Sequence, residues 1–304
     1  MLCDPMGPRI SVVIPTIEEE SVFELIGSIR KLLGEGTEII IVDKSSEAYR
    51  IRLRKTGATV IRQLSRGVEN AVMEGLQKAR GDVLASIDGD ATHDVSGIAD
   101  GVRLIEEGKA DLVLGNRMHS LEKGSMSPYL VFGNTVLSRM FSSLYKAKVD
   151  DVLTGLFVVS KKTFESIRSV DPYRAGIAFF AIELARRGYK VRQVDIRYYK
   201  RRHGESKLTK SKLAYGVNVA SHLVRQLRDY SPMLLFGGIG IVIIIIGLVL
   251  GIGVLIQFAQ NGTFSLTGRA LLAFLLVVVG MLFFVAGMIL DVLVEIEKKL
   301  MKMQ

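Results

Sequence analysis

The stretch VLASIDGDATHD, residues 83–94, decides the fold. Its first five residues have the apolar pattern of a buried strand, and they run directly into Asp88-Gly89-Asp90. In an α/β sheet, ligands bind in the crevice at the carboxyl ends of the strands, so this strand presents two carboxylates to a ligand. Hard oxygen ligands suit Mg²⁺ or Mn²⁺, and magnesium is commonly held by one or two carboxylates plus substrate phosphates. The motif predicts a divalent-metal site for a nucleotide-linked substrate, with an acidic turn as the alternative.

Around this stretch, strand patterns alternate with helix patterns. Short apolar runs rich in β-branched residues predict strands at 10–14, 38–42, 59–62, 83–87 and 111–114. Helical spacing or composition predicts helices at 18–33, 50–56, 67–79 and 96–107. Beyond Arg117 the pattern is less regular, with helices predicted at 129–146 and 179–187 and strands at 156–159 and 190–199. This alternation indicates βαβ units and a largely parallel sheet.

Because parallel strands end at the same edge of a sheet, the acids that follow them should share one rim. Glu19, Asp43 and Asp88 all lie at or just beyond the ends of predicted strands. A helix cap is the alternative for Asp43.

Apolar residues are concentrated in the last quarter of the 304-residue chain. Residues 234–258 and 270–290 contain no charged residue, and each run is long enough to cross a hydrocarbon core of about 30 Å as a helix. The sequence therefore predicts a hairpin of two transmembrane helices, at about 233–257 and 269–292. A pair of buried core helices is the alternative, but such helices rarely run so long without a polar face.

The cations around these helices predict their orientation. The connection between them contains one cation, Arg269, whereas cations precede the first helix and follow the second at Arg225, Arg228, Lys298, Lys299 and Lys302. By the positive-inside rule, the N-terminal domain and the C-terminal tail should be cytoplasmic, in a multi-pass protein of the cell membrane. The net charge of +9 would suit nucleic acid or an anionic membrane, and the apolar helices favour the lipid bilayer over nucleic acid.

The N-terminus and the cysteine content fit this interpretation. The first residues show no pattern of a cleavable signal peptide, and the single cysteine, Cys3, rules out an intramolecular disulfide. Asn261-Gly262-Thr263, between the two apolar helices, is formally a glycosylation acceptor, and whether Asn261 is modified stays open.

The most basic stretch, KRRHGESKLTKSK, covers residues 200–212. It leads into an amphipathic region, at 208–230, that would lie in the membrane interface as a helix. A solvated basic linker is the alternative. The expected organisation is a cytoplasmic domain at 1–207, this interfacial region, and a membrane part at 231–304.

The order of these motifs resembles glycosyltransferase family 2, and within it the dolichol-phosphate mannosyltransferases and polyprenyl-phosphate glucosyltransferases. The resemblance covers about residues 9–212. It rests on Pro15-Thr16-Ile17-Glu18-Glu19, Val42-Asp43, Asp88-Gly89-Asp90 with His93, Gly115-Asn116-Arg117, Thr154-Gly155, and Arg202-His203-Gly204-Glu205-Ser206-Lys207-Leu208. It implies a Rossmann-like nucleotide-sugar glycosyltransferase domain of the GT-A type, and the two apolar helices are similar to the membrane anchors of some members.

The resemblance also implies roles for particular residues. In similar enzymes, the loop after the first strand and the acid after the second hold the nucleoside, which points to Pro15, Thr16, Glu19 and Asp43. Asp88 and Asp90 would hold the nucleotide and Mg²⁺ or Mn²⁺. The position at which the family often carries a metal-contacting Gln is Thr92, which leaves the third protein ligand open. Ile17-Glu18 replaces the usual Tyr-Asn, and Lys44 replaces a second acid, so the identity of the base is not carried over.

A nucleotide sugar leaves as a diphosphate, so its enzyme must neutralise negative charge on the leaving oxygen. A metal ion does this as a Lewis acid, and arginine adds bidentate phosphate contacts. Arg117, Arg202 and Lys207 are candidates for phosphate contacts, with an exposed surface charge as the alternative for Arg117. Asp151 is a candidate for orienting sugar hydroxyls, with a backbone cap as the alternative.

An acceptor phosphate needs little chemical activation. A lipid phosphate is already ionised near neutral pH, with a second pKa of about 6, so no strong general base is required. Catalysis would rest on positioning and electrostatics, and direct displacement would invert the anomeric centre.

Together these observations predict a membrane-anchored, inverting glycosyltransferase. It would move a hexose from a nucleotide sugar, with GDP-mannose favoured and UDP-glucose next, to a polyprenyl or dolichyl phosphate at the cytoplasmic face. One alternative is a processive polysaccharide synthase, but those enzymes resemble one another in a Gln-x-x-Arg-Trp segment and this chain has no Trp. The other is a non-catalytic membrane scaffold, which the intact acidic and basic motifs disfavour. Whether the chain forms a homo-oligomer through the membrane hairpin stays open.

Overall fold

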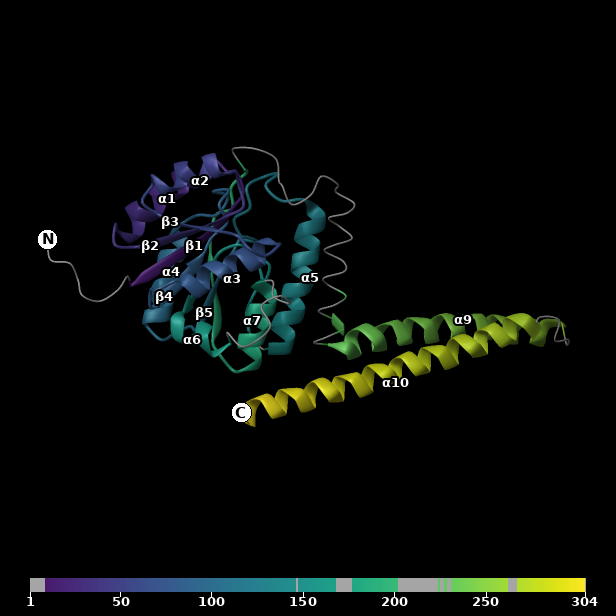
Figure 1. Cartoon of the computed structure of the whole chain (residues 1–304). Helices are drawn as coiled ribbons and strands as arrows, with labels where there is room; N and C mark the ends of the chain where they lie inside the picture. The colour runs from purple at the N-terminus through teal and green to yellow at the C-terminus, as the bar shows by residue number, and fades with distance from the viewer. Residues whose placement is uncertain are drawn as a thin grey trace. The chain divides into compact units, whose positions relative to one another are not determined.

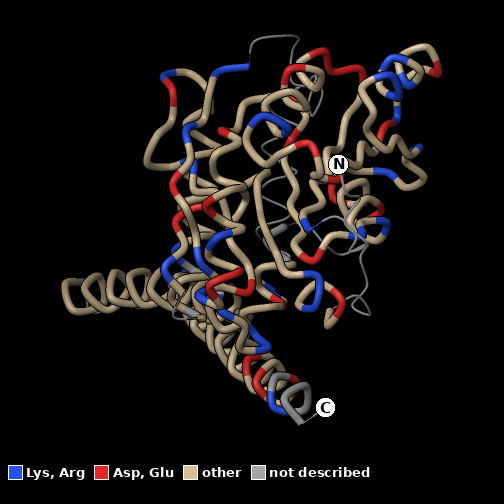
Figure 2. Tube along the Cα trace, turned by 90° about the vertical axis from the view of Figure 1, so that its left-hand side faces the viewer, with Lys and Arg blue, Asp and Glu red and all other residues tan. Residues whose placement is uncertain are grey.

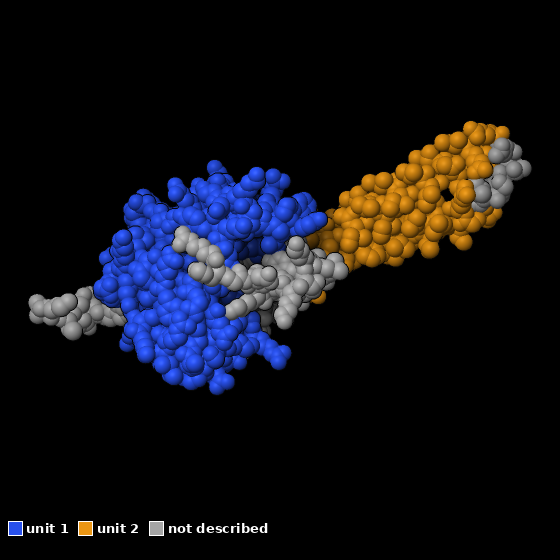
Figure 3. Space-filling model, turned by 90° about the horizontal axis from the view of Figure 1, so that it is seen from above, with its two compact units in different colours: residues 1–208 blue, residues 209–304 orange. Residues whose placement is uncertain are grey.

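The computed structural model divides the chain into two compact units, residues 1–208 and residues 209–304 (Figure 3). It describes residues 9–145, 147–167, 177–201, 224, 227–228, 231–261 and 267–303. Unit 1 is an α/β domain and unit 2 contains two apolar helices (Figure 1).

Unit 1 is organised around a seven-stranded sheet in the order β3-β2-β1-β4-β6-β5-β7. Its strands are β1 (Ile10–Thr16), β2 (Glu38–Asp43), β3 (Thr59–Arg62), β4 (Val83–Ser86), β5 (Leu112–Asn116), β6 (Phe157–Ser160) and β7 (Val191–Asp195). All of these are parallel to one another except β6, which pairs antiparallel with both β4 and β5. The predicted α/β class with a largely parallel sheet is therefore confirmed.

The helices of unit 1 also follow the predicted order. They are α1 (Ser21–Leu33), α2 (Glu47–Arg54), α3 (Val68–Lys78), α4 (Ser96–Glu106), α5 (Pro128–Tyr145), α6 (Lys161–Ser166) and α7 (Ile177–Arg186). The first helix begins three residues later than predicted, because β1 continues to Thr16 and Glu18 has a φ of 43°, which is outside the right-handed helical region.

Helices cover both faces of the sheet, because neighbouring residues of a strand point to opposite sides. Val12 and Ile14 of β1 pack in the same apolar cluster as buried residues of α1 and α4. Val13, between them, instead faces α3, where an added Cβ on Gly75 would lie 2.3 Å from its side chain. The sheet is therefore buried on both sides, and its strand ends are left to form a site.

Unit 2 is a pair of apolar helices. A π-helical turn (Met233–Gly237) leads into α9 (Gly238–Asn261), and α10 (Thr267–Met303) follows. Residues 233–260 and 267–297 are long and apolar enough to cross a membrane, and charged residues gather toward the C-terminal end of α10 (Figure 2). Helix α10 runs past the predicted end at residue 292, and an i,i+4 ion pair of 3.0 Å between Lys299 and Glu295 stabilises its polar extension. The interfacial region predicted at 208–230 and the loop after Asn261 lie mostly outside the described residues.

Glycines bring α9 and α10 into backbone contact. A Cβ added to Gly240 would lie 2.6 Å from the carbonyl oxygen of Gly280 and 2.8 Å from the nitrogen of Phe284. A Cβ on Gly280 would lie 2.7 Å from the carbonyl oxygen of Gly240. Small residues permit this close approach, which is a main source of attraction between apolar helices in lipid.

We expect Gly240→Ala to destabilise the hairpin. Overpacking of this kind costs about 1–3 kcal/mol, although the helix propensity of alanine offsets up to about 1 kcal/mol of it. Because Gly253→Ala gains the same helix propensity, thermal unfolding in detergent should show a Tm for Gly240→Ala at least about 2 °C below that of Gly253→Ala. Gly253→Ala is the matched control, because its Cβ would meet nothing within 4 Å. Equal melting temperatures for the two variants would contradict the close packing.

Candidate functional site

The candidate site lies at the carboxyl edge of the sheet, where the strand order reverses between β1 and β4. Glu19 follows β1, and Asp88 and Asp90 follow β4, so neighbouring strands deliver them. Asp43 ends β2, which pairs with the other side of β1. Ligands of α/β sheets bind at such a reversal, so the acids predicted to share a rim do lie on the edge where a ligand is expected.

Asp88 is packed against Gly155. A Cβ on Gly155 would lie 2.0 Å from Oδ2 of Asp88 and 2.4 Å from its Cγ. The contact follows from the antiparallel pairing of β4 and β6, which sets Ser86 opposite Phe157. Burial raises the pKa of Asp88 to about 6, and the nearby charge of Asp90 acts in the same direction. Two carboxylates that repel each other in this way favour a cation between them.

Asp90 is held by the turn that it begins. The backbone nitrogen and the hydroxyl of Thr92 both donate hydrogen bonds to Oδ1 of Asp90, at 3.2 Å and 2.7 Å. Ala91, between them, has a φ of 53°, a conformation that residues other than glycine rarely adopt and that clusters at functional sites. The other carboxylate oxygen, Oδ2, is left facing a cation, the guanidinium of Arg201 at 3.7 Å.

Arg201 joins the acids of two strands. Its Nη2 forms an ion pair with Oε2 of Glu19, a residue that is only 6% exposed, and also approaches Asp90. The sequence prediction missed this residue and named Arg202 and Lys207, which both lie outside the described residues. The spacing could have identified it. In the Arg-x-x-Gly-x-Ser-Lys pattern of similar enzymes, the arginine stands three residues before the glycine, which here is Arg201.

Arg201 ends a short segment that crosses the acidic loop, and we call residues 197–201 the strap. Regular pairing of β7 stops at Asp195, earlier than the predicted residue 199, because the strap hydrogen bonds to loops instead. Its backbone contacts are Asp94 N to Arg197 O at 3.1 Å, Tyr199 N to Thr92 O at 2.7 Å, and Tyr198 N to Ser120 O at 3.1 Å. An open pocket of about 650 Å³ lies between the strap and residues 120–122.

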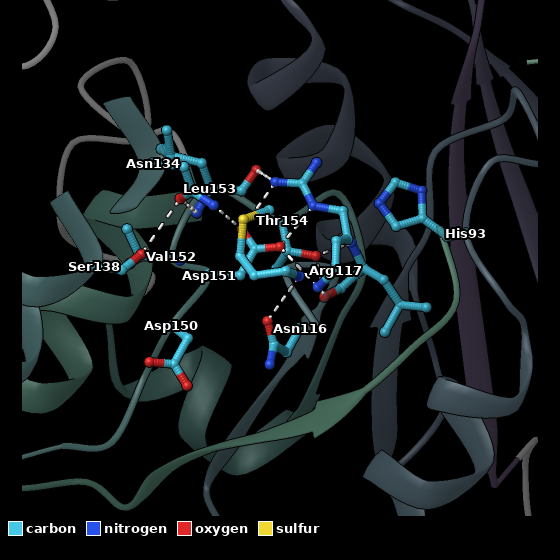
Figure 4. A network of polar contacts seen from close by, with 12 residues as sticks. His93, Asn116, Arg117, Asn134, Ser138, Asp150, Asp151, Val152, Leu153 and Thr154 are labelled. Atoms are coloured by element: carbon cyan, nitrogen blue, oxygen red, sulfur yellow. Dashed lines mark hydrogen bonds and ion pairs between the residues drawn. The ribbon is translucent and has the colours of Figure 1, made fainter. Parts of the chain in front are cut away.

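Arg117 and Asp151 form a buried ion pair (Figure 4). Nε of Arg117 donates to Oδ2 of Asp151 at 2.7 Å, and Nη2 donates to Oδ1 at 2.9 Å. Nη2 also donates to the carbonyl oxygen of Leu153 at 2.8 Å, and Asn134 donates to Oδ1 of Asp151 at 2.7 Å. Although burial opposes it, Arg117 holds the pKa of Asp151 below its usual value.

This pair bears on two predicted roles. Arg117 is 8% exposed, so the alternative of an exposed surface charge is wrong. Asp151 is fully buried and both its oxygens accept hydrogen bonds, an arrangement that favours anchoring Arg117 over orienting a sugar. Contacts of Arg117 with phosphate and of Asp151 with sugar stay predictions. The guanidinium carbon of Arg117 also lies 5.3 Å from the ring centre of Tyr198, which connects the pair to the strap.

The residues predicted to hold the nucleoside lie on the β1 and β2 ends of the same edge. Asp43 is fully buried, and its carboxylate accepts a hydrogen bond from the nitrogen of Ser45 at 2.9 Å. Thr16 is opposite Asp43 in the register, and the carbonyl oxygen of Pro15 lies 2.9 Å from where a Cβ on Gly89 would stand. The Gly of Asp-Gly-Asp therefore lets the β1 and β4 ends approach closely. The nucleoside contacts of Pro15, Thr16, Glu19 and Asp43 stay predictions.

The acids of this edge fit a magnesium or manganese ion that is shared with a substrate. Among the described residues, no group of three or more His, Cys, Asp or Glu side chains is placed to hold a metal. Mg²⁺ is usually bound through one or two carboxylates and substrate phosphates, so Asp88 and Asp90 are enough protein ligands for such an ion. The raised pKa of Asp88 and the outward Oδ2 of Asp90 are what such a site needs. Thr92 as the third ligand stays a prediction.

Comparison with known proteins identifies the family. The family model described as glycosyl transferase family 2 matches residues 11–167. The chain is 27% identical over 212 residues to the low-salt glycan biosynthesis hexosyltransferase Agl6 of Haloferax volcanii. The aligned segment covers 67% of this chain and 50% of Agl6, so the chain spans half the length of that relative. It is 30% identical over 203 residues to a dolichyl-phosphate hexose transferase of the same organism, covering 66% of this chain and 86% of the relative.

A solved structure shares the fold. The mannosyltransferase PcManGT from Pyrobaculum calidifontis, in complex with GDP-Man and Mn²⁺, superposes with a TM-score of 0.51 at 17% identity, over 74% of this chain and 64% of that one. This similarity supports a Rossmann-like domain of the GT-A type, as the sequence predicted. Since that family model matches more than half of its length, the chain belongs to glycosyl transferase family 2.

Proposed function

We propose that this protein is a membrane-anchored, inverting hexosyltransferase that moves a hexose from a nucleotide sugar to a polyprenyl or dolichyl phosphate at the cytoplasmic face. The observation that carries the proposal is that Asp88, Asp90 and the cationic strap lie together at one edge of the sheet. GDP-mannose is the favoured donor and UDP-glucose the next, and the GDP-Man bound to PcManGT supports the first choice. The name of the dolichyl-phosphate hexose transferase relative supports the hexose and the lipid acceptor.

On the donor side, the protein supplies two carboxylates and at least one guanidinium. A bound Mg²⁺ or Mn²⁺, held by Asp88 and Asp90, would stabilise the charge of the departing diphosphate. Arg201 places a cation beside these acids, within 3.7 Å of Asp90, and its fork suits phosphate oxygens. Because Arg201 is paired with Glu19, its guanidinium is held in place at this edge.

On the acceptor side, the open pocket beside the strap fits a phosphate on an apolar chain. Three cations, Arg197, Lys200 and Arg201, line it together with one acid, Glu122, and Tyr198 and Tyr199 add aromatic surface. The phosphate oxygen is already ionised near neutral pH, so the pocket has only to hold it in line with the anomeric carbon. Arg117, Arg202 and Lys207 remain further candidates for phosphate contacts.

The apolar helices support the membrane part of the proposal. Residues 233–260 and 267–297 are each long and apolar enough to span a bilayer. Arg225 and Arg228 before them and Lys298, Lys299 and Lys302 near the C-terminus favour a cytoplasmic catalytic domain and tail. A polyprenyl phosphate presents its head group at the bilayer surface, where such a domain would be held.

The test is an assay of the purified full chain in detergent. GDP- and UDP-sugars should be supplied in turn with a polyprenyl phosphate and Mn²⁺, and the product extracted into organic solvent. We expect one donor to give a hexosyl phospholipid of inverted anomeric configuration, and unphosphorylated polyprenol to give none. No turnover of any donor would refute the proposal and favour the non-catalytic scaffold, and a growing polysaccharide would refute it in favour of the processive synthase.

Arg201→Ala should lower kcat/KM by about tenfold to a hundredfold, because a hydrogen bond to a charged group is worth about 1.5–3 kcal/mol. Arg201→Lys should recover only part of this loss, since lysine lacks the fork. Arg192→Ala, an exposed cation early in β7, is the matched control and should leave activity unchanged. Separate KM values for donor and lipid phosphate would show which phosphate Arg201 serves. If Arg201→Ala behaves like the control, Arg201 does not belong to the site.

A further inference from the structure

We propose that Thr92 and His93 form a positioning pair, in which His93 orients the hydroxyl of Thr92 and Thr92 sets the carboxylate of Asp90 without itself binding the metal. The inference rests on the proposed function, because it concerns how this chain prepares Asp90 for a cation. It also explains why Thr92 can stand where similar enzymes often have a metal-contacting Gln.

The hydroxyl of Thr92 is committed by two short contacts. Its Oγ1 lies 2.7 Å from Oδ1 of Asp90 and 3.2 Å from Nδ1 of His93. An ionised carboxylate only accepts hydrogen bonds, so the hydroxyl hydrogen must point to Asp90. The Thr92 oxygen then accepts from His93, which requires the imidazole hydrogen to be on Nδ1. The result is a directed chain of donors from His93 through Thr92 to Asp90.

The surroundings of the His93 ring restrict its orientation and its hydrogen bonding. The residue is 3% exposed, and its ring lies edge-on to Tyr198 with centroids 5.1 Å apart. Its Nε2 is buried and has no hydrogen-bond partner among the described residues, so its one polar contact there is with Thr92. The strap fixes the neighbouring backbone as well, since Tyr199 N donates to the carbonyl oxygen of Thr92 at 2.7 Å.

This arrangement works against metal ligation by Thr92. The Thr92 hydroxyl donates its hydrogen to Asp90, accepts from His93 with one of its two lone pairs, and also forms a side-chain hydrogen bond with Tyr198. To turn its oxygen toward a cation, Thr92 would have to give up one of these bonds. Among the described residues, Nε2 of His93 already lacks a partner. Leaving a second buried polar atom without a partner costs about 1–3 kcal/mol. With these bonds kept, Oδ1 of Asp90 accepts two hydrogen bonds from Thr92, one from its nitrogen and one from its hydroxyl. Oδ2 of Asp90 then accepts none from Thr92 and lies 3.7 Å from Arg201. The contacts of the Thr92 side chain therefore favour a role in positioning Asp90 over a role as a metal ligand.

The first arm of the test varies Thr92 in the full chain in detergent. The affinity for Mn²⁺ in the presence of GDP or UDP should be read from the spectroscopic signal of free Mn²⁺. Thr92→Val, which keeps the shape but removes the hydroxyl, should weaken Mn²⁺ binding about tenfold to a hundredfold, the usual effect of losing a group that orients a ligand. Thr92→Ser should restore it to nearly the wild-type value. Thr163→Val is the control, because Thr163 is equally buried but bonds to Ser160 at the opposite end of β6.

The second arm separates positioning from direct ligation through His93. His93→Asn places an amide nitrogen near the position of Nδ1, whereas His93→Gln places one near Nε2. We expect His93→Asn to keep most of the Mn²⁺ affinity, and His93→Gln and His93→Phe to lose it about as Thr92→Val does. The double variant Thr92→Val/His93→Phe should be no weaker than Thr92→Val alone, because both changes break one chain of contacts.

The outcomes distinguish this inference from the proposed function. If the wild type binds no Mn²⁺ with either nucleotide, the proposed metal-dependent donor site fails and this inference fails with it. If the wild type binds Mn²⁺ and Thr92→Val binds it equally well, only the inference fails. Loss of affinity in Thr92→Val with full affinity in every His93 variant would overturn the pair, because Thr92 would then act on the metal site without His93. Should Thr92→Val not fold, as judged by its Tm, the His93 variants and Thr92→Ala decide the same question.

Discussion

Gly155→Ala should reduce hexosyl transfer by at least about a hundredfold while leaving the protein folded. The new methyl group would stand 2.0 Å from Oδ2 of Asp88, far inside van der Waals contact, so the carboxylate must move. A displacement of about 1 Å in a catalytic constellation can cost about a hundredfold in rate.

The measurements are kcat/KM with the active donor and the melting temperature. Gly36→Ala is the matched control, since a Cβ there would meet nothing within 4 Å, and it should keep full activity. Nearly normal activity in Gly155→Ala would mean that Asp88 tolerates displacement and has little to do with the metal or the diphosphate.

The sequence predicted the sheet well because its signals are local. Apolar β-branched runs identify strands, and parallel strands put their carboxyl ends on one edge. Glu19, Asp43, Asp88 and Asp90 therefore fall where they were expected. The two apolar helices were predictable for the same reason, since a long apolar run without charge is typical of a helix that crosses a membrane.

The contacts between distant segments were not predictable in this way. The pairing of Arg117 with Asp151 joins residues 34 positions apart, and nothing in the local pattern of either reveals the partner. The contact of Gly155 with Asp88 depends on β6 running antiparallel to β4, whereas the alternation of strands and helices indicates parallel neighbours. Local periodicity does not encode such partners.

The strap shows a third kind of limit. Its sequence reads as a continuation of β7, but its backbone hydrogen bonds go to Thr92, Asp94 and Ser120 instead of a neighbouring strand. This departure turns Arg201 onto Glu19 and Asp90, and so it makes Arg201 the described cation that pairs with both acids. In the sequence, the role of Arg201 was indicated only by the spacing of the motif, in which the glycine, Gly204, stands three residues after Arg201.

Asp90→Asn should lower transfer by about a hundredfold to a thousandfold, the range for losing one preorganised electrostatic group, and should abolish Mn²⁺-dependent nucleotide binding. Asparagine keeps an oxygen that can accept from the nitrogen and hydroxyl of Thr92, so the turn is preserved. What changes is the other oxygen, which becomes an uncharged NH₂ group directed at Arg201. That group can neither bind a cation nor accept a hydrogen bond. Asp94→Asn is the control, because Asp94 follows the same strand but its Oδ1 accepts a hydrogen bond from the nitrogen of Ser96 at 2.9 Å, a bond that an asparagine oxygen can also accept. If Asp90→Asn keeps more than about a tenth of wild-type activity, Asp90 is not a metal ligand, and its carboxylate serves only to pair with Arg201.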